Sequence, residues 1–163
     1  MEDVAVPNAK VARLTGLKRA EGKPVDLLVH GQNIGDDAMR IVDLTDEGFE
    51  LNDVVSMLST SDLYLQGDMV KRITGKSVRT VRRLLKEGKS VRLDPLQSVI
   101  AYQHALVLEM ATRAFGRQSR AEEWLQKPTP YMNGRVPLEL IRHFLGFQMV
   151  EQYLGQVIYG VYT

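Results

Sequence analysis

The chain of 163 residues contains no cysteine, three histidines and only 7% aromatic residues. The absence of cysteine excludes a disulfide framework, a thiol nucleophile and any cysteine-ligated zinc or iron–sulfur site. No run approaches the roughly 20 apolar residues that a membrane-spanning helix requires, and the first residues, MEDVAVPNAK, lack the basic and apolar regions of a secretory signal. With 44% hydrophobic and 25% charged residues, the composition is typical of a soluble globular protein. We expect it to be cytoplasmic, with no membrane as partner.

The net charge of +1 conceals two adjacent blocks of opposite sign. Residues 36–68 carry nine acidic side chains and one basic one, whereas residues 69–92 carry nine basic side chains and one acidic one. Such a density of one sign repels itself in the folded state unless a polyanion or an acidic neighbour offsets it. The basic block therefore favours nucleic acid as a partner, and a solvated surface is the competing interpretation. The acidic block matches no motif; it could neutralise the basic block within a dimer or contact another protein.

Apolar residues recur at helical spacing along most of the chain, which predicts an all-α fold. Residues 1–35 show no sustained period, and only Val25–Val29 could make a short strand, so we expect an irregular arm there that is loosely ordered or held by a partner. Helices are expected from Asp36 and over 52–59, 66–74, 77–86, 95–115, 119–126, 137–145 and 148–160. The predicted domains are an N-terminal arm (1–35), a DNA-binding and dimerisation domain (36–116) and a small helical domain (117–163).

Residues 66–86 have the outline of a helix-turn-helix unit, because Gly75 favours a helix end and Ser77 can cap the next helix. The second helix of such a unit enters the DNA major groove, where the planar fork of arginine matches guanine. A solvated face normally mixes charges, and this one is almost wholly basic, which favours DNA binding. We expect contacts at or near the bases from Ser77, Arg79, Thr80 and Arg83. We expect phosphate contacts from Lys71, Lys76, Arg82, Lys86 and Lys89.

No catalytic or metal-binding constellation is evident in the sequence. His30, His104 and His143 form no ligand-spaced pair, and His104 is expected to lie in the core or half-buried. No serine, threonine or lysine stands beside a base in a pattern typical of a nucleophile. The run VKRITGKS over Val70–Ser77 ends like a phosphate-binding loop but lacks the leading glycine and a preceding strand. We therefore predict that the protein is not an enzyme and holds no metal or cofactor.

The C-terminal segment carries an ordered set of residues: Ala121, Trp124–Leu125, Pro128, Gly134, Pro137–Leu138, Leu140–Ile141, Gly146, Val150, Leu154, Ile158 and Gly160–Tyr162. This set resembles the C-terminal toxin-binding domain of the Xre/MbcA/ParS-type antitoxins of bacterial type II toxin–antitoxin modules. The preceding residues 73–116 are similar to the helix-turn-helix portion of the same antitoxins. The resemblance covers residues 50–163 and leaves the arm and the start of the acidic block unexplained.

The resemblance implies both a partner and a mode of action. Such antitoxins commonly pair with RES-domain toxins, which degrade NAD or transfer its ADP-ribose. The antitoxin covers the toxin's active site with its C-terminal domain and represses the shared operon through its helix-turn-helix domain, generally as a homodimer on operator DNA. In this sequence, the residues implied to contact the toxin are Arg135, Gln152, Gln156, Tyr159, Tyr162 and Thr163.

The composition of the C-terminal end favours a protein partner independently, because tyrosine and arginine are typical interface anchors. Two other functions stay open: a stand-alone helix-turn-helix regulator whose C-terminal lobe binds a ligand or dimerises, and a small enzyme.

An ordinary small core explains the larger apolar residues of the C-terminal domain. Its expected members are Trp124, Leu138, Leu140, Ile141, Phe144, Phe147, Val150, Leu154 and Ile158.

Overall fold

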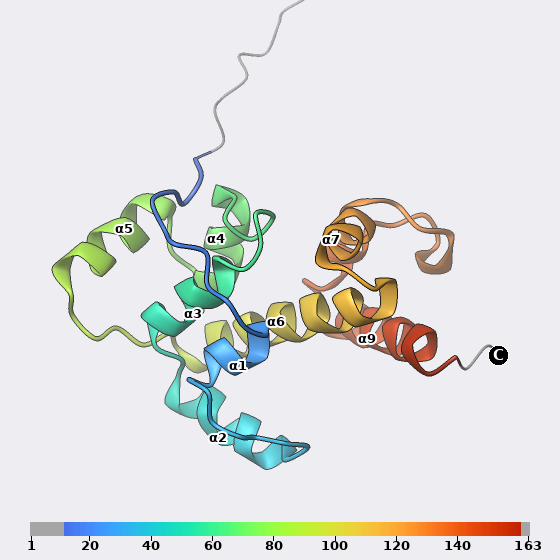
Figure 1. The fold of residues 1–163 in the computed structure, drawn as a ribbon, viewed down its shortest axis with the longest axis horizontal. Coiled ribbons are helices and arrows are strands. Elements are labelled where there is room, and N and C mark those ends of the chain that lie inside the picture. The colour runs from blue at the N-terminus through green and yellow to red at the C-terminus, as the bar shows by residue number, and fades with distance from the viewer. Residues whose placement is uncertain (1–11, 161–163) are drawn as a thin grey trace, which may run out of the picture.

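A computed structural model of the protein describes residues 12–160, and Figure 1 shows its arrangement. Over that range the secondary structure is helical and contains no β-strand, which confirms the all-α prediction. The helices are α1 (Pro24–Leu28), α2 (Ala38–Glu47), α3 (Leu51–Leu58), α4 (Gly67–Thr74), α5 (Val78–Glu87), α6 (Pro95–Phe115), α7 (Gln118–Gln126), the 3-10 helix η1 (Pro130–Met132), α8 (Pro137–Leu140) and α9 (Phe144–Tyr159). None of these helices has the length and apolar character needed to cross a bilayer.

The central element is α6, a helix of 21 residues that contacts α1, α2, α4, α7 and α9. Asp94 caps its start by accepting the backbone N–H of Gln97 at 2.8 Å, and Gly116 ends it in the left-handed conformation with φ 83°. Ala101, Ala105 and Ala111 are fully buried, so neighbouring helices can approach closely. In Figure 1, α6 runs across the molecule with α5 toward one end and the end of α9 toward the other.

The described part of the N-terminal segment packs into the core, which corrects two expectations. Val25–Leu28 is part of the short helix α1 and not a strand. Leu14, Leu28 and Val29 are only 1–3% exposed, so residues 12–35 are irregular apart from α1 but are not loosely ordered. These apolar residues do not recur at a regular spacing, so a search for a period cannot detect their burial. The division into three domains at 35/36 and 116/117 stays a prediction.

A histidine and a tyrosine meet at the centre of the core. The Tyr64 hydroxyl donates to the carbonyl of His104 at 2.7 Å, and the two rings lie edge to face. His104 is 1% exposed, as expected, and its Nδ1 lies 2.9 Å from the carbonyl of Ile100. Burial lowers the pKa of His104 to about 4, because the charged imidazolium loses its hydration. Its Nε2 has no hydrogen-bond partner among residues 12–160. The fold therefore holds this imidazole in its neutral form at pH 7.

Candidate functional site

The predicted order of a helix, a glycine-containing turn and a second helix is present in α4 and α5. Gly75 ends α4 with φ 73°, and its N–H donates to the carbonyl of Lys71 at 2.8 Å. Ser77 caps α5 by accepting the N–H of Thr80 at 3.2 Å. Within the turn, the Thr74 hydroxyl accepts the N–H of Lys76 at 3.1 Å. These local bonds define the end of α4, the turn and the start of α5.

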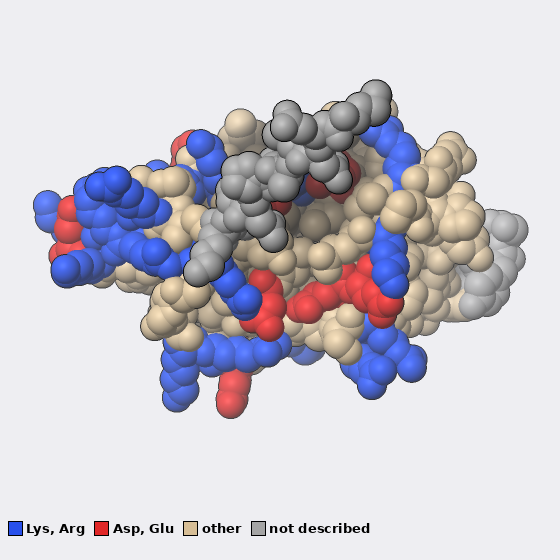
Figure 2. All heavy atoms as spheres, turned by 90° about the horizontal axis from the view of Figure 1, so that it is seen from above, with Lys and Arg blue, Asp and Glu red and all other residues tan. Residues whose placement is uncertain are grey.

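The outer face of α5 is basic and exposed. Val78 and Val81 are buried, which turns the opposite side of the helix toward solvent. That side carries Arg79, Arg82, Arg83 and Lys86, at the spacing i, i+3, i+4 and i+7 that places residues on one helix face. Figure 2 shows lysine and arginine side chains gathered at the end of the molecule where α5 lies.

The nine predicted DNA-contacting residues fall into groups with different partners. Among the described residues, no partner is found for the side-chain nitrogens of Lys71, Lys76, Arg79, Lys86 and Lys89. Arg83 forms an ion pair with Glu87 at 2.8 Å on its own helix. The remaining three are engaged in the fold: Arg82, described below, and the capping pair Ser77 and Thr80, whose hydroxyls are 3.0 Å apart.

The N-terminal segment holds Arg82, a contact that sequence reasoning missed. Arg82 Nη2 donates to the carbonyl of Arg13 at 2.6 Å and to Thr15 Oγ1 at 3.0 Å. Leu14 donates its N–H to the carbonyl of Leu65 at 2.9 Å and buries its side chain. Residues 12–15 therefore lie against α5 and the start of α4. No local sequence pattern predicts the contacts of Arg82, because its partners Arg13 and Thr15 are 67 or more residues away in the sequence.

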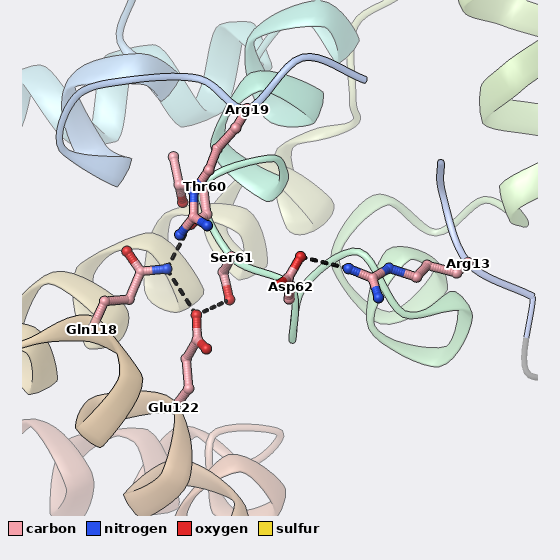
Figure 3. A network of polar contacts seen from close by, with 7 residues as sticks. All are labelled: Arg13, Arg19, Thr60, Ser61, Asp62, Gln118 and Glu122. Atoms are coloured by element: carbon pink, nitrogen blue, oxygen red, sulfur yellow. Dashed lines mark hydrogen bonds and ion pairs between the residues drawn. The ribbon is translucent and has the colours of Figure 1, made fainter. Parts of the chain in front are cut away.

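A polar network continues from this segment to α7 (Figure 3). Arg19 donates to the carbonyl of Thr60 at 3.0 Å, and Gln118 Nε2 donates to the same carbonyl at 2.5 Å. Glu122 accepts from both Ser61 Oγ, at 2.8 Å, and Gln118 Nε2, at 2.7 Å. The loop between α3 and α4 is thus joined on one side to residues 12–20 and on the other to α7.

A second connection runs from α4 to α8. Arg72 donates to the carbonyl of Leu138 at 3.2 Å and to Glu139 Oε1 at 3.0 Å. The Arg72 guanidinium lowers the pKa of Glu139 below its ordinary value. One member of the basic block is therefore used inside the fold, where it joins α8 to α4.

The predicted toxin-contacting residues are only partly brought together. Gln152, Gln156 and Tyr159 recur at i, i+4 and i+7 on α9, so they share a helix face. Tyr159 is 71% exposed, and the Arg113 guanidinium lies 5.5 Å from its ring centre. Arg135 is exposed in the turn before α8, with no hydrogen bond or ring contact to those three. Tyr162 and Thr163 lie outside the described residues.

The expected core of this domain needs one correction. Leu138, Leu140, Ile141, Phe147, Val150 and Leu154 are buried, and Trp124 and Ile158 are half-buried. Phe144, the first residue of α9, is 70% exposed and does not join this core. The adjacent Leu145 is 69% exposed, and Tyr131 of η1 is 71% exposed. Sequence reasoning did not single out Leu145 or Tyr131, since an apolar pattern does not distinguish core from interface.

Comparison with known proteins identifies the class of this C-terminal region. Residues 110–160 match the model of the antitoxin Xre/MbcA/ParS C-terminal toxin-binding domain. A curated relative, "Antitoxin Xre" of Pseudomonas putida, is 26% identical over 83 residues, which are 51% of this chain and 51% of that protein. The match thus spans about half the length of the relative. The resemblance drawn from the sequence is confirmed: residues 110–160 match the toxin-binding domain of Xre/MbcA/ParS-type antitoxins.

Proposed function

We propose that this protein is the antitoxin of a bacterial type II toxin–antitoxin module. Its C-terminal domain would neutralise a RES-domain, NAD-consuming toxin by covering the active site, and its α4–α5 unit would bind operator DNA and repress the operon. The observation that carries the proposal is the toxin-binding family match over residues 110–160. The protein would act by binding alone, with no cofactor and no reaction of its own.

The arrangement of the helices supports two separate binding functions. In Figure 1, α5 and the C-terminal end of α9 lie at opposite ends of the molecule. The unpartnered cations on α4 and α5 suit phosphates. A homodimer is proposed because helix-turn-helix proteins generally read two half-sites with two copies of the unit.

The toxin-inhibiting surface is proposed to include the C-terminal end of the chain. Gln152, Gln156 and Tyr159 follow one face of α9 toward residues 161–163. Together with Arg135, Tyr162 and Thr163, they would offer polar and aromatic groups to a pocket that binds NAD. In this interpretation, the end of α9 obstructs the toxin's substrate site.

The test is co-expression with a RES-domain protein encoded in the adjacent reading frame, followed by co-purification and an assay of NAD consumption. The full chain is expected to co-purify with the toxin and abolish NAD consumption. Deletion of residues 157–163 is expected to restore it while leaving operator binding unchanged. A truncated protein that inhibits fully would contradict the role of the C-terminal end. Operator binding without any toxin binding would leave the stand-alone regulator as the function.

A further inference from the structure

A second part of the C-terminal domain has the character of a binding surface. On α9, Leu145 and Met149 continue the face of Gln152 and Gln156 toward the start of the helix, at i, i+4, i+7 and i+11. Leu145 is 69% exposed and Met149 is 46% exposed. Tyr131, which is 71% exposed, lines with Met149, Gln152 and Gln156 a hollow of about 250 Å³. We call Tyr131, Leu145, Met149, Gln152 and Gln156 the α9 surface.

Stacked aromatic rings hold Tyr131 in place. Its ring lies 4.8 Å from that of Tyr153, which stacks on Trp124 at 5.5 Å with an angle of 11° between the planes. Trp124 in turn contacts Phe115, the last residue of α6, at 5.2 Å. An exposed side chain that is already fixed loses little conformational entropy when a partner covers it. Tyrosine in such a position is typical of the residues that carry most of the energy of an interface.

The chemistry of the α9 surface restricts its partner. None of its five residues is charged, in contrast to α5, so nucleic acid is not its ligand. Its apolar side chains favour the uncharged surface of a folded protein, and Gln152 and Gln156 can exchange hydrogen bonds with that protein. All five residues lie within the 110–160 range of the toxin-binding family match.

We propose that the α9 surface anchors the toxin, with Tyr131, Leu145 and Met149 supplying most of the affinity. This inference rests on the proposed function, which provides the toxin as the partner. The inference assigns affinity and inhibition to different parts of the domain. The start of α9 and η1 bind the toxin, while the end of α9 obstructs its active site. A RES-domain toxin must therefore present an uncharged, apolar patch beside its substrate pocket.

The experiment measures the affinity of the full chain for the adjacent RES-domain toxin, inactivated at its catalytic site, by surface plasmon resonance. Tyr131→Ala and Met149→Ala are each expected to weaken binding by about tenfold or more, whereas Tyr131→Phe, which keeps the ring, stays within about threefold of the wild type. Leu145→Ala has a matched control in Leu96→Ala, because Leu96 of α6 is equally exposed at 70%. Leu145→Ala should lose affinity, and Leu96→Ala should not.

Tyr159 provides the second control, since it matches Tyr131 in residue type and in its exposed fraction of 71%. Tyr159→Ala should impair inhibition of NAD consumption more than binding. The proposal is overturned if Tyr131→Ala and Met149→Ala bind like the wild type, or if Tyr159→Ala loses more affinity than Tyr131→Ala. It is also overturned if Leu145→Ala and Met149→Ala only dissociate a complex of two copies of this chain. If the wild type does not bind the toxin, the proposed function fails together with this inference. If the wild type binds and the variants bind equally well, only this inference fails. Circular dichroism melting curves verify that each variant is folded.

Discussion

Replacing Arg79 and Lys86 by alanine removes two cations from the exposed face of α5 that no described residue neutralises. With Lys71 of α4 and Lys76 of the turn, they make four unpartnered cations per protomer in α4, α5 and the turn between them. A dimer would then neutralise about eight phosphates, which gives a slope of log affinity against log salt concentration of about −7. The double variant keeps about four of these contacts, so its slope is expected to fall to about −4.

Fluorescence anisotropy with operator DNA between 50 and 200 mM salt measures these slopes, the range over which about eight contacts change affinity roughly ten-thousandfold. Arg120→Ala is the matched control, because Arg120 is an exposed arginine on α7, remote from α5 in the sequence. Its slope should equal that of the wild type. A double variant with the wild-type slope, or a loss of equal size in Arg120→Ala, would refute the assignment of α5 to DNA.

Three further predictions concern stability. Because burial lowers the pKa of His104 to about 4 from 6.5, the unfolded chain binds more protons between these values, and stability is lost as pH falls through this range. Urea unfolding should show a loss of about 2–3 kcal/mol between pH 7 and pH 4.5 from this group, which His104→Gln should remove. An added Cβ at Gly146 would lie 2.1 Å from the last carbonyl of α8, so Gly146→Ala should destabilise by about 3 kcal/mol. At Gly155, on the same helix, an added Cβ meets nothing within 4 Å, so Gly155→Ala should stabilise the protein by about 0.5–1 kcal/mol. Thermal melts of both glycine variants measure these changes, and equal effects of the two substitutions would contradict the packing described. A double-mutant cycle on Arg72 and Glu139 should give a coupling of about 1 kcal/mol, since Glu139 is half exposed, and zero coupling would show that the ion pair does not join α4 to α8.

The elements that the sequence predicted well are those set by local signals. Gly75 and Ser77 mark the turn between α4 and α5, and both act as expected. Asp94 and Pro95 mark the start of α6 in the same way. These residues act through backbone conformation and short-range hydrogen bonds, so their effect can be predicted without knowledge of the tertiary structure.

The features that could not be predicted depend on contacts between distant segments. The bond from Arg82 to the carbonyl of Arg13 spans 69 residues and gives this side chain a partner inside the fold. Its contact with a phosphate stays a prediction. The burial of Leu14 depends on the same segment. Phe144 was expected in the core but is exposed. The sequence could not predict this, because hydrophobicity alone does not distinguish a side chain that packs in the core from one that binds another protein.

The most direct test of the proposed function is a titration of the purified adjacent RES-domain toxin with this protein, with NAD consumption as the readout. The account predicts that NAD consumption falls linearly and stops once every toxin molecule is bound. It also predicts that Tyr131→Ala shifts the titration to higher protein concentration. NAD consumption that continues unchanged at a large excess of the wild-type protein would contradict it.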